Sequence, residues 1–326
     1  METLINPPNM NSEYLKALNF CFNSWGDLAM FHWCFTRTIG GLSNDIIVIK
    51  ENDELIAGSG VTYRPIRIHT GIISTVGIMT GSFTLPASRG KGCFTEMIKT
   101  SKALCAQKGV ALLLAFVTAD NASFRRLANA GSALYPTWYL FNQKASPDLV
   151  NCSNFHVINP DDDDVTNRIF ELSFSNQKNK THFTYTYDEW KSQFIHRPSA
   201  ITIISFEEAN YCLMDEKSEV IKILALYCSQ NSSIAKYIQI MQVYAARQNK
   251  KLYVFTASEC WKEYCVQAGF KCFPGYMTVL ITNHAAYKDI VVNKYFSHEL
   301  DESVLIPSKH HVGILGPWTI QSGDRM

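Results

Sequence analysis

Two glycines and two basic residues follow one another in the segment Arg89-Gly90-Lys91-Gly92. Glycine lets a backbone approach a ligand closely and supplies the left-handed conformation that tight turns require. If a helix begins directly after this segment, its free backbone N–H groups and its dipole favour a bound anion. The two basic side chains add positive charge. The chemistry that suits such a loop is the binding of a pyrophosphate group.

The residues around the loop predict elements that place it at the start of a helix. A strand is predicted at 75–85, and residues 94–109 carry apolar side chains at the i, i+3, i+4 spacing of a helix. The continuous apolar run 110–118 predicts a buried parallel strand. A short helix at 123–130 and a further strand at 133–142 follow. The loop therefore joins the carboxyl end of a strand to the N-terminus of a helix.

The loop matches neither of the two common glycine-rich nucleotide motifs. The Walker pattern is absent, and the dinucleotide pattern G-x-G-x-x-G fails because position 95 is threonine. The segment instead resembles the R/Q-x-x-G-x-G/A loop of the GNAT superfamily of acyl-CoA-dependent N-acyltransferases. The match holds through Gly92 and departs at Phe94, and Asn121, Ser123 and Gly131 are similar to the downstream signature.

The resemblance covers most of residues 20–142, and it implies where an acyl donor binds. The pyrophosphate of coenzyme A would lie on the backbone amides of residues 89–94, and its pantetheine would run beside the end of the preceding strand. The residues implied in donor binding are Phe83, Thr84, Leu85, Arg89, Gly90, Lys91, Gly92, Cys93, Phe94, Asn121 and Ser123. For Cys93, a nucleophilic thiol at the helix start is an alternative to packing.

The second half of the chain repeats this order of elements without the loop. Between the strand predicted at 219–229 and the helix predicted at 233–250 there is neither a glycine pair nor a basic residue. The chain therefore resembles tandem-GNAT proteins of the mixed α/β class, in which each module is a central mixed sheet flanked by helices. Residues 1–146 would form the acyl-CoA module, and residues 147–326 a degenerate module with a tail that shapes the acceptor cleft.

Candidates for acid–base chemistry come from the resemblance and from residue type. Many GNAT enzymes carry a tyrosine that protonates the leaving thiolate, but the matching position here lies near Leu127. Tyr135 is a candidate acid, with ordinary strand packing as the alternative. In tandem-GNAT proteins the C-terminus can enter the cleft, which makes Asp324 and the Met326 carboxylate candidate bases. A frayed, polar chain end is the alternative. Further bases by residue type are His32, His69 and Asp120.

Composition and charge narrow the class of protein. Lys and Arg number 30 against 29 Asp and Glu, so a uniformly basic protein that binds nucleic acid or a membrane surface is not expected. No apolar run reaches the ~20 residues that span a bilayer, and the first residues lack the pattern of a signal peptide. The ten cysteines form no C-x-x-C pair, so we expect no metal site and a cytoplasmic location.

The function implied by the resemblance is acyl transfer from acyl-CoA to a primary amine, by direct attack in a ternary complex. The tract 89–126 is similar to bacterial enzymes that acylate nucleotide-linked (dTDP-type) amino-deoxysugars for surface lipopolysaccharide. A small-molecule amine of this kind is therefore the expected partner. Its pyrophosphate would meet basic residues outside the loop, namely Arg64, Arg67, Arg125 and Arg126. An aminoglycoside or polyamine acetyltransferase, and a non-catalytic acyl-CoA-binding sensor, are the alternatives.

Overall fold

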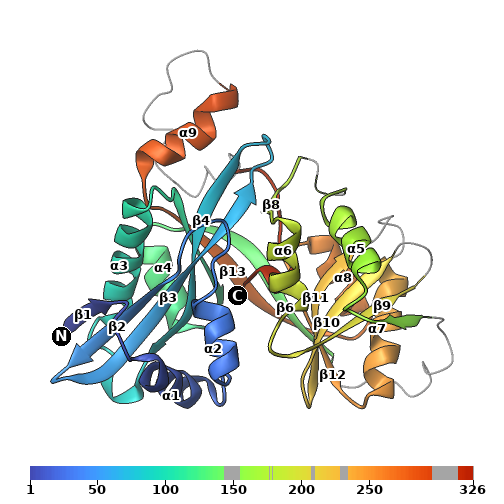
Figure 1. The fold of residues 1–326 in the computed structure, drawn as a ribbon, viewed down its shortest axis with the longest axis horizontal. Coiled ribbons are helices and arrows are strands. Elements are labelled where there is room, and N and C mark those ends of the chain that lie inside the picture. The colour runs from blue at the N-terminus through green and yellow to red at the C-terminus, as the bar shows by residue number, and fades with distance from the viewer. Residues whose placement is uncertain are drawn as a thin grey trace. The chain divides into compact units, whose positions relative to one another are not determined.

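The structure is a computed structural model. It describes residues 1–142, 155–175, 177, 179–206, 210–227, 234–295 and 315–325 (Figure 1). The predicted module boundary at 146/147, the loop at 229–233 and Met326 lie outside the described residues. Helices alternate with strands of a mixed sheet, so the predicted mixed α/β class is confirmed.

The chain divides into two compact units, and each unit takes segments from both halves of the sequence. The first unit contains residues 1–135 and a segment that begins at Tyr276. The second unit contains residues 136–275 and the tail 318–325. The functional division into a donor-binding module and an acceptor-shaping module stays a prediction.

The first unit is built on strands that lie in the order β1, β2, β3, β4, β5 and β13. The first four pair antiparallel, and β5 runs parallel to β4, as its apolar run predicts. Asn52 and Asp53 both have positive φ angles, and this two-residue turn joins β2 to β3 with the twist that hairpins require. The strands are β1 (Glu2–Ile5), β2 (Asp45–Glu51), β3 (Glu54–Arg67), β4 (Ile73–Thr84), β5 (Leu112–Thr118) and β13 (Lys271–Ile281).

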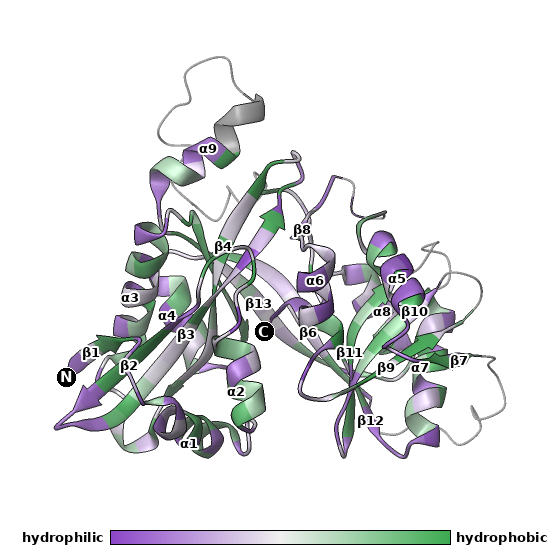
Figure 2. Ribbon diagram, viewed as in Figure 1, coloured by the Kyte–Doolittle hydropathy of each residue, from purple (hydrophilic) through white to green (hydrophobic). Residues whose placement is uncertain are grey.

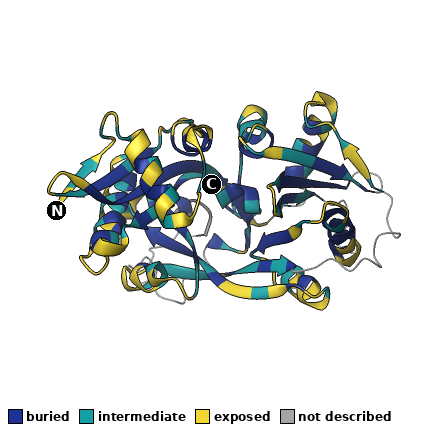
Figure 3. Ribbon diagram, turned by 90° about the horizontal axis from the view of Figure 1, so that it is seen from below, coloured by how far each residue is buried: buried dark blue, intermediate teal, exposed yellow. Residues whose placement is uncertain are grey.

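Helices cover both faces of this sheet (Figure 3). On one face, aromatic side chains of α1 and α2 pack around Phe83, with Tyr14 and Phe35 at the centre. On the other face, Met97 and Cys105 of α3 pack against β2, β3 and β5. The helices of the first unit are α1 (Asn11–Phe22), α2 (Leu28–Phe35), α3 (Cys93–Gln107), α4 (Ala122–Asn129) and α9 (His284–Tyr295).

The second unit repeats the pattern with strands in the order β6, β12, β11, β10, β9 and β7. Apolar residues lie along β10 and β11 (Figure 2), and they form a core with residues of α7 and α8. The strands are β6 (Ala133–Asn142), β7 (His156–Ile158), β9 (Ala200–Ser205), β10 (Tyr211–Glu216), β11 (Val220–Tyr227) and β12 (Lys251–Thr256). The helices are α5 (Asp163–Ser175), α6 (Tyr187–Trp190), which continues as a π-helical turn to Ile195, α7 (Ile234–Arg247) and α8 (Glu259–Gln267).

Each unit completes its sheet with a strand from the other half of the sequence. The end of β13 lies beside β5, where the Thr282 backbone N–H donates to the Ala111 carbonyl oxygen at 2.9 Å. The end of β6 pairs antiparallel with β12, from Trp138 opposite Thr256 to Asn142 opposite Leu252. The apolar pattern predicts both strands, but a two-residue period specifies a face and not a partner.

Close packing of α3 on β4 depends on Gly77. A Cβ at this position would lie 2.5 Å from Cys105 Sγ, and both residues are buried. We expect Gly77→Ala to lower the free energy of unfolding by ~1–3 kcal/mol, because overpacking displaces α3. In a Cys105→Ala background the same substitution should cost clearly less, since the clashing sulfur is gone. Urea unfolding of both single variants and the double variant measures this coupling, and strictly additive effects would contradict it.

Candidate functional site

A cavity of about 660 Å³ opens in the first unit where β4 and β5 stop pairing. Their parallel register runs only from Val76 opposite Leu112 to Ile78 opposite Leu114. The residues that follow in both strands, including 81–84 of β4 and 115–117 of β5, line the cavity. The strands therefore diverge and leave main-chain groups of β4 along one wall.

A β-bulge shapes this wall. Gly58 pairs with Phe83 and Gly60 pairs with Thr80, so Gly81 and Ser82 together oppose the single residue Ser59. Gly81 has a φ of +59°, a conformation that favours glycine. The extra residue reverses the alternation of side chains, so Phe83 packs against α1 and α2 while Met79 packs on the α3 side.

The glycine-rich loop forms the opposite end of the cavity. Gly90 and Gly92 both have φ angles of +85°, and no atom lies within 4 Å of a Cβ built at either position. α3 begins at Cys93, directly after Gly92. The first N–H groups of a helix have no partner within the helix, and the dipole there is positive. The loop thus offers bare backbone donors, as the sequence predicts.

Two arginines supply the charge of the cavity. Arg89 and Arg126 line it, whereas Lys91 Nζ pairs with Glu51 Oε2 at 2.5 Å. Among the described residues that line the cavity, none is Asp, Glu, His or Tyr. The Lys91 side chain lowers the pKa of Glu51 by hydrogen bonding. The cavity is therefore cationic and suited to an anion.

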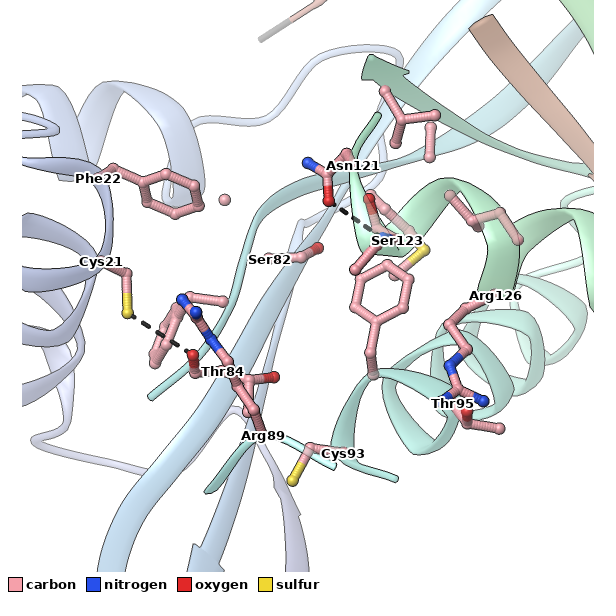
Figure 4. A pocket seen from close by; sticks show the side chains of 18 of the residues that line it. Cys21, Phe22, Ser82, Thr84, Arg89, Cys93, Thr95, Asn121, Ser123 and Arg126 are labelled. Atoms are coloured by element: carbon pink, nitrogen blue, oxygen red, sulfur yellow. Dashed lines mark hydrogen bonds between the residues drawn. The ribbon is translucent and has the colours of Figure 1, made fainter. Parts of the chain in front are cut away.

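α4 forms the remaining wall (Figure 4). Asn121 is the N-cap of this helix and accepts a hydrogen bond from the Ser123 backbone N–H at 3.0 Å. Both side chains line the cavity. Leu127, near which the resemblance placed the tyrosine of the family, also lines the cavity and cannot act as an acid.

Two thiols line the cavity, and burial raises the pKa of both. Burial raises the pKa of Cys21, although the Arg89 charge partly opposes the shift. Burial also raises the pKa of Cys93, whose side chain is 2% exposed. A neutral, buried thiol is a poor nucleophile. The structure therefore favours packing as the role of Cys93.

All of the predicted donor-binding residues except Leu85 and Lys91 line this one cavity. Their contact with a ligand stays a prediction. The sequence did not single out the α1 side of the cavity, where Cys21, Phe22 and Trp25 contribute. In the sequence, these residues are marked only by being apolar or aromatic and by lying shortly before α2. Arg126 was predicted to meet a second pyrophosphate, and it lies in the lining of this cavity.

None of the acid–base candidates is among the described residues that line this cavity. Tyr135 is half-buried in β6 and does not line the cavity, and the same holds for the half-buried His69. His32 and Asp120 are exposed and also do not line it. Asp324 belongs to the second unit. The catalytic roles of Tyr135, Asp324 and Met326 stay predictions.

The described part of the tail is folded into the second unit, so a frayed end is excluded for residues 318–325. Trp318 pairs with Thr181, as β14 (Trp318–Thr319) on β8 (Thr181–Phe183), and is 9% exposed. Asp324 is 4% exposed. Gly323 and Asp324 are buried, whereas a frayed end would be exposed.

Four contacts fix the end of the tail. Tyr185 Oη donates to Asp324 Oδ1 at 2.9 Å, and the Gln321 backbone N–H donates to Oδ2 at 2.7 Å. The Arg325 guanidinium lies 3.9 Å from the ring centroid of Phe255 and donates to Tyr253 Oη at 2.8 Å. These contacts hold Asp324 and Arg325 in place.

The described residues contain no group of three or more His, Cys, Asp and Glu side chains arranged to hold a metal ion. No helix within the same residues is long and apolar enough to cross a membrane.

No protein-family model and no curated protein matches the sequence. Solved structures do match. A tandem GNAT protein from the clavulanic acid biosynthesis pathway superimposes with a TM-score of 0.62 at 10% identity, over 86% of this chain and 99% of that chain. A probable N-acyltransferase from Enterococcus faecalis gives a TM-score of 0.60 at 11% identity, over 88% of this chain and 74% of that chain.

The chain has a tandem GNAT fold. Its likeness extends to Saccharomyces cerevisiae N-myristoyltransferase with bound myristoyl-CoA, at a TM-score of 0.63 and 10% identity over 86% of this chain and 79% of that chain. At these identities the likeness concerns the fold. The GNAT fold expected from the loop at 89–94 is thereby confirmed.

The raised pKa of Cys93 predicts slow alkylation. At pH 7.5 we expect iodoacetamide to label Cys93 far more slowly than the exposed Cys260, because burial suppresses both the thiolate and access to it. The Cys93 rate should keep rising as the pH passes the usual thiol pKa of ~8.5. Peptide mapping by mass spectrometry resolves the two sites. Labelling of Cys93 as fast as that of Cys260 would favour the nucleophile instead.

Proposed function

We propose that the protein is an acyl-CoA-dependent N-acyltransferase, which moves an acyl group from a coenzyme A thioester to a primary amine. The observation that carries the proposal is the cavity between the diverging β4 and β5, which ends on the glycine-rich start of α3. The GNAT fold supports it, because the solved structures of similar fold include N-acetyltransferases.

The donor would use backbone groups throughout. The pyrophosphate would lie on the amides of residues 89–94, where Gly90 and Gly92 leave open space. The pantetheine would run along the edge of β4 at Ser82–Thr84, which β5 no longer covers. Backbone N–H groups near the bulge would polarise the thioester carbonyl, as donors do in an oxyanion hole.

The chemistry needs little from side chains of the donor cavity. A neutral amine held near the thioester carbon attacks it directly, and the carbon–sulfur bond breaks to release the coenzyme A thiolate. A thiol pKa near ~8.5 makes this thiolate a good leaving group, so water can protonate it. The proton lost by the amine needs a base, for which we propose the Asp324 or Met326 carboxylate.

The acceptor is the finer part of the proposal. We propose a nucleotide-linked amino-deoxysugar of the dTDP type, in a cytoplasmic step of surface polysaccharide synthesis. Of the basic residues predicted to meet its pyrophosphate, Arg64 is buried and Arg126 lines the donor cavity. Arg67 and Arg125 are exposed and stay candidates.

One observation favours a second candidate function. The described residues that line the cavity include no acid or base, which suits a non-catalytic acyl-CoA sensor. A thiol-release assay with acetyl-CoA over a panel of nucleotide-linked amino sugars, aminoglycosides and polyamines separates the candidates. Turnover on an amine supports the transferase. Tight coenzyme A binding without turnover on any amine favours the sensor.

Substitution of Gly92 tests the donor site. Gly92→Asp places a carboxylate beside the expected pyrophosphate, so coenzyme A affinity should fall more than tenfold, or ~1.4 kcal/mol. Gly109→Asp is the matched control, because Gly109 follows the other end of α3, also has a positive φ of +70° and also has open space around it. Calorimetry should find its affinity nearly unchanged. Equal binding by both folded variants would show that the donor site is wrongly assigned.

Substitution of Asp324 separates its structural role from a catalytic one. Asp324→Asn turns an amide NH2 toward one of its two donors, so we expect a loss of ~1–3 kcal/mol in stability. Tyr185→Phe removes one donor and keeps the carboxylate. If Asp324 accepts the proton, kcat should fall sharply in Asp324→Asn and little in Tyr185→Phe. The melting temperature should fall in both variants. An unchanged kcat in Asp324→Asn would leave the Met326 carboxylate as the proposed base.

A further inference from the structure

Four basic residues belong to the glycine-rich loop or to α4, namely Arg89, Lys91, Arg125 and Arg126. The structure gives them different surroundings. Lys91 is paired with Glu51 and is not among the residues that line the cavity. Arg125 is exposed and does not line it either. Arg89 and Arg126 line it, and both are exposed. Only two of the four cations are therefore placed to meet a ligand in this cavity.

These two arginines lie on different walls (Figure 4). Arg89 precedes α3 and lies on the side of Thr84 and Cys21. Its positive charge acts to lower the pKa of the Cys21 thiol. Arg126 comes from α4, the helix that also brings Ser123 to the cavity. Among the described residues, no ion pair involves either guanidinium. The cavity thus presents two separate cationic centres.

Coenzyme A carries two separate anionic groups, the pyrophosphate and the phosphate on the 3′ position of its ribose. The pyrophosphate accounts for the loop that contains Arg89. It does not account for a second arginine on another wall. A guanidinium binds a phosphate through two parallel hydrogen bonds, which gives both affinity and orientation.

We infer that Arg126 binds the 3′-phosphate of coenzyme A, and that it makes the site selective for free coenzyme A thioesters. Acyl donors that keep the pantetheine arm but lack this phosphate, such as acyl groups on a carrier protein, are then poor donors. The inference rests on the proposed function, because it takes the cavity as the coenzyme A site. It adds a specificity-determining residue outside the glycine-rich loop.

Calorimetric titration with coenzyme A and with 3′-dephospho-coenzyme A tests the inference. The full chain should bind coenzyme A about tenfold more tightly than the dephospho form, or ~1.4 kcal/mol. Arg126→Gln should weaken coenzyme A by that factor, leave dephospho-coenzyme A unchanged and so abolish the preference. Arg125→Gln is the matched control, because it removes the same charge from the neighbouring exposed position of α4 and should keep the preference.

The outcomes distinguish this inference from the donor assignment. An equal loss for both ligands in Arg126→Gln would mean that Arg126 meets the pyrophosphate, and an unchanged preference would mean that it meets neither; each result overturns the inference. No binding of coenzyme A by the unmodified chain would instead overturn the proposed function. Arg126→Lys, which keeps the charge and loses the paired donors, should retain part of the preference and guards against misfolding of the glutamine variant.

Discussion

The separation of β4 from β5 after Ile78 is the constraint on which the candidate site depends. A paired sheet would use the main-chain groups of β4 for hydrogen bonds to its neighbour and leave no space between the strands. The bulge at Gly81 and Ser82 bends β4 at the point where pairing ends. Bare backbone, an open wall and the start of α3 then come together in one cavity, and each depends on that divergence.

The groups that line the cavity are suited to binding a ligand rather than to transferring a proton. Its described lining offers arginines, backbone amides and neutral thiols, and it offers no carboxylate, imidazole or phenol. Such a lining suits an anion, and fixing the position of the donor is the contribution that the proposed acyl transfer from an activated thioester would need most. Proton transfer would then depend on groups outside the cavity.

The local sequence pattern predicted the helices and strands well, but it did not predict which residues far apart in the chain pair with one another. The helical spacing in 94–109 and the apolar run 110–118 gave α3 and β5, because both signals are carried by neighbouring residues. The bulge in β4 was missed, since one extra residue leaves the alternation of a short strand ambiguous. The pairing of Lys91 with Glu51 and the burial of Asp324 were missed because each joins positions far apart in the chain.

The exchange of β6 and β13 has a consequence for how the protein is made. The first unit borrows its last strand from residues beyond Tyr276, so its sheet stays incomplete until most of the chain has left the ribosome. Until then β5 exposes an unpaired edge, which is a template for association with other chains. Folding must therefore wait for contacts of high sequence separation, and these form slowly. A fragment that ends near residue 146 would lack the strand that closes its own sheet.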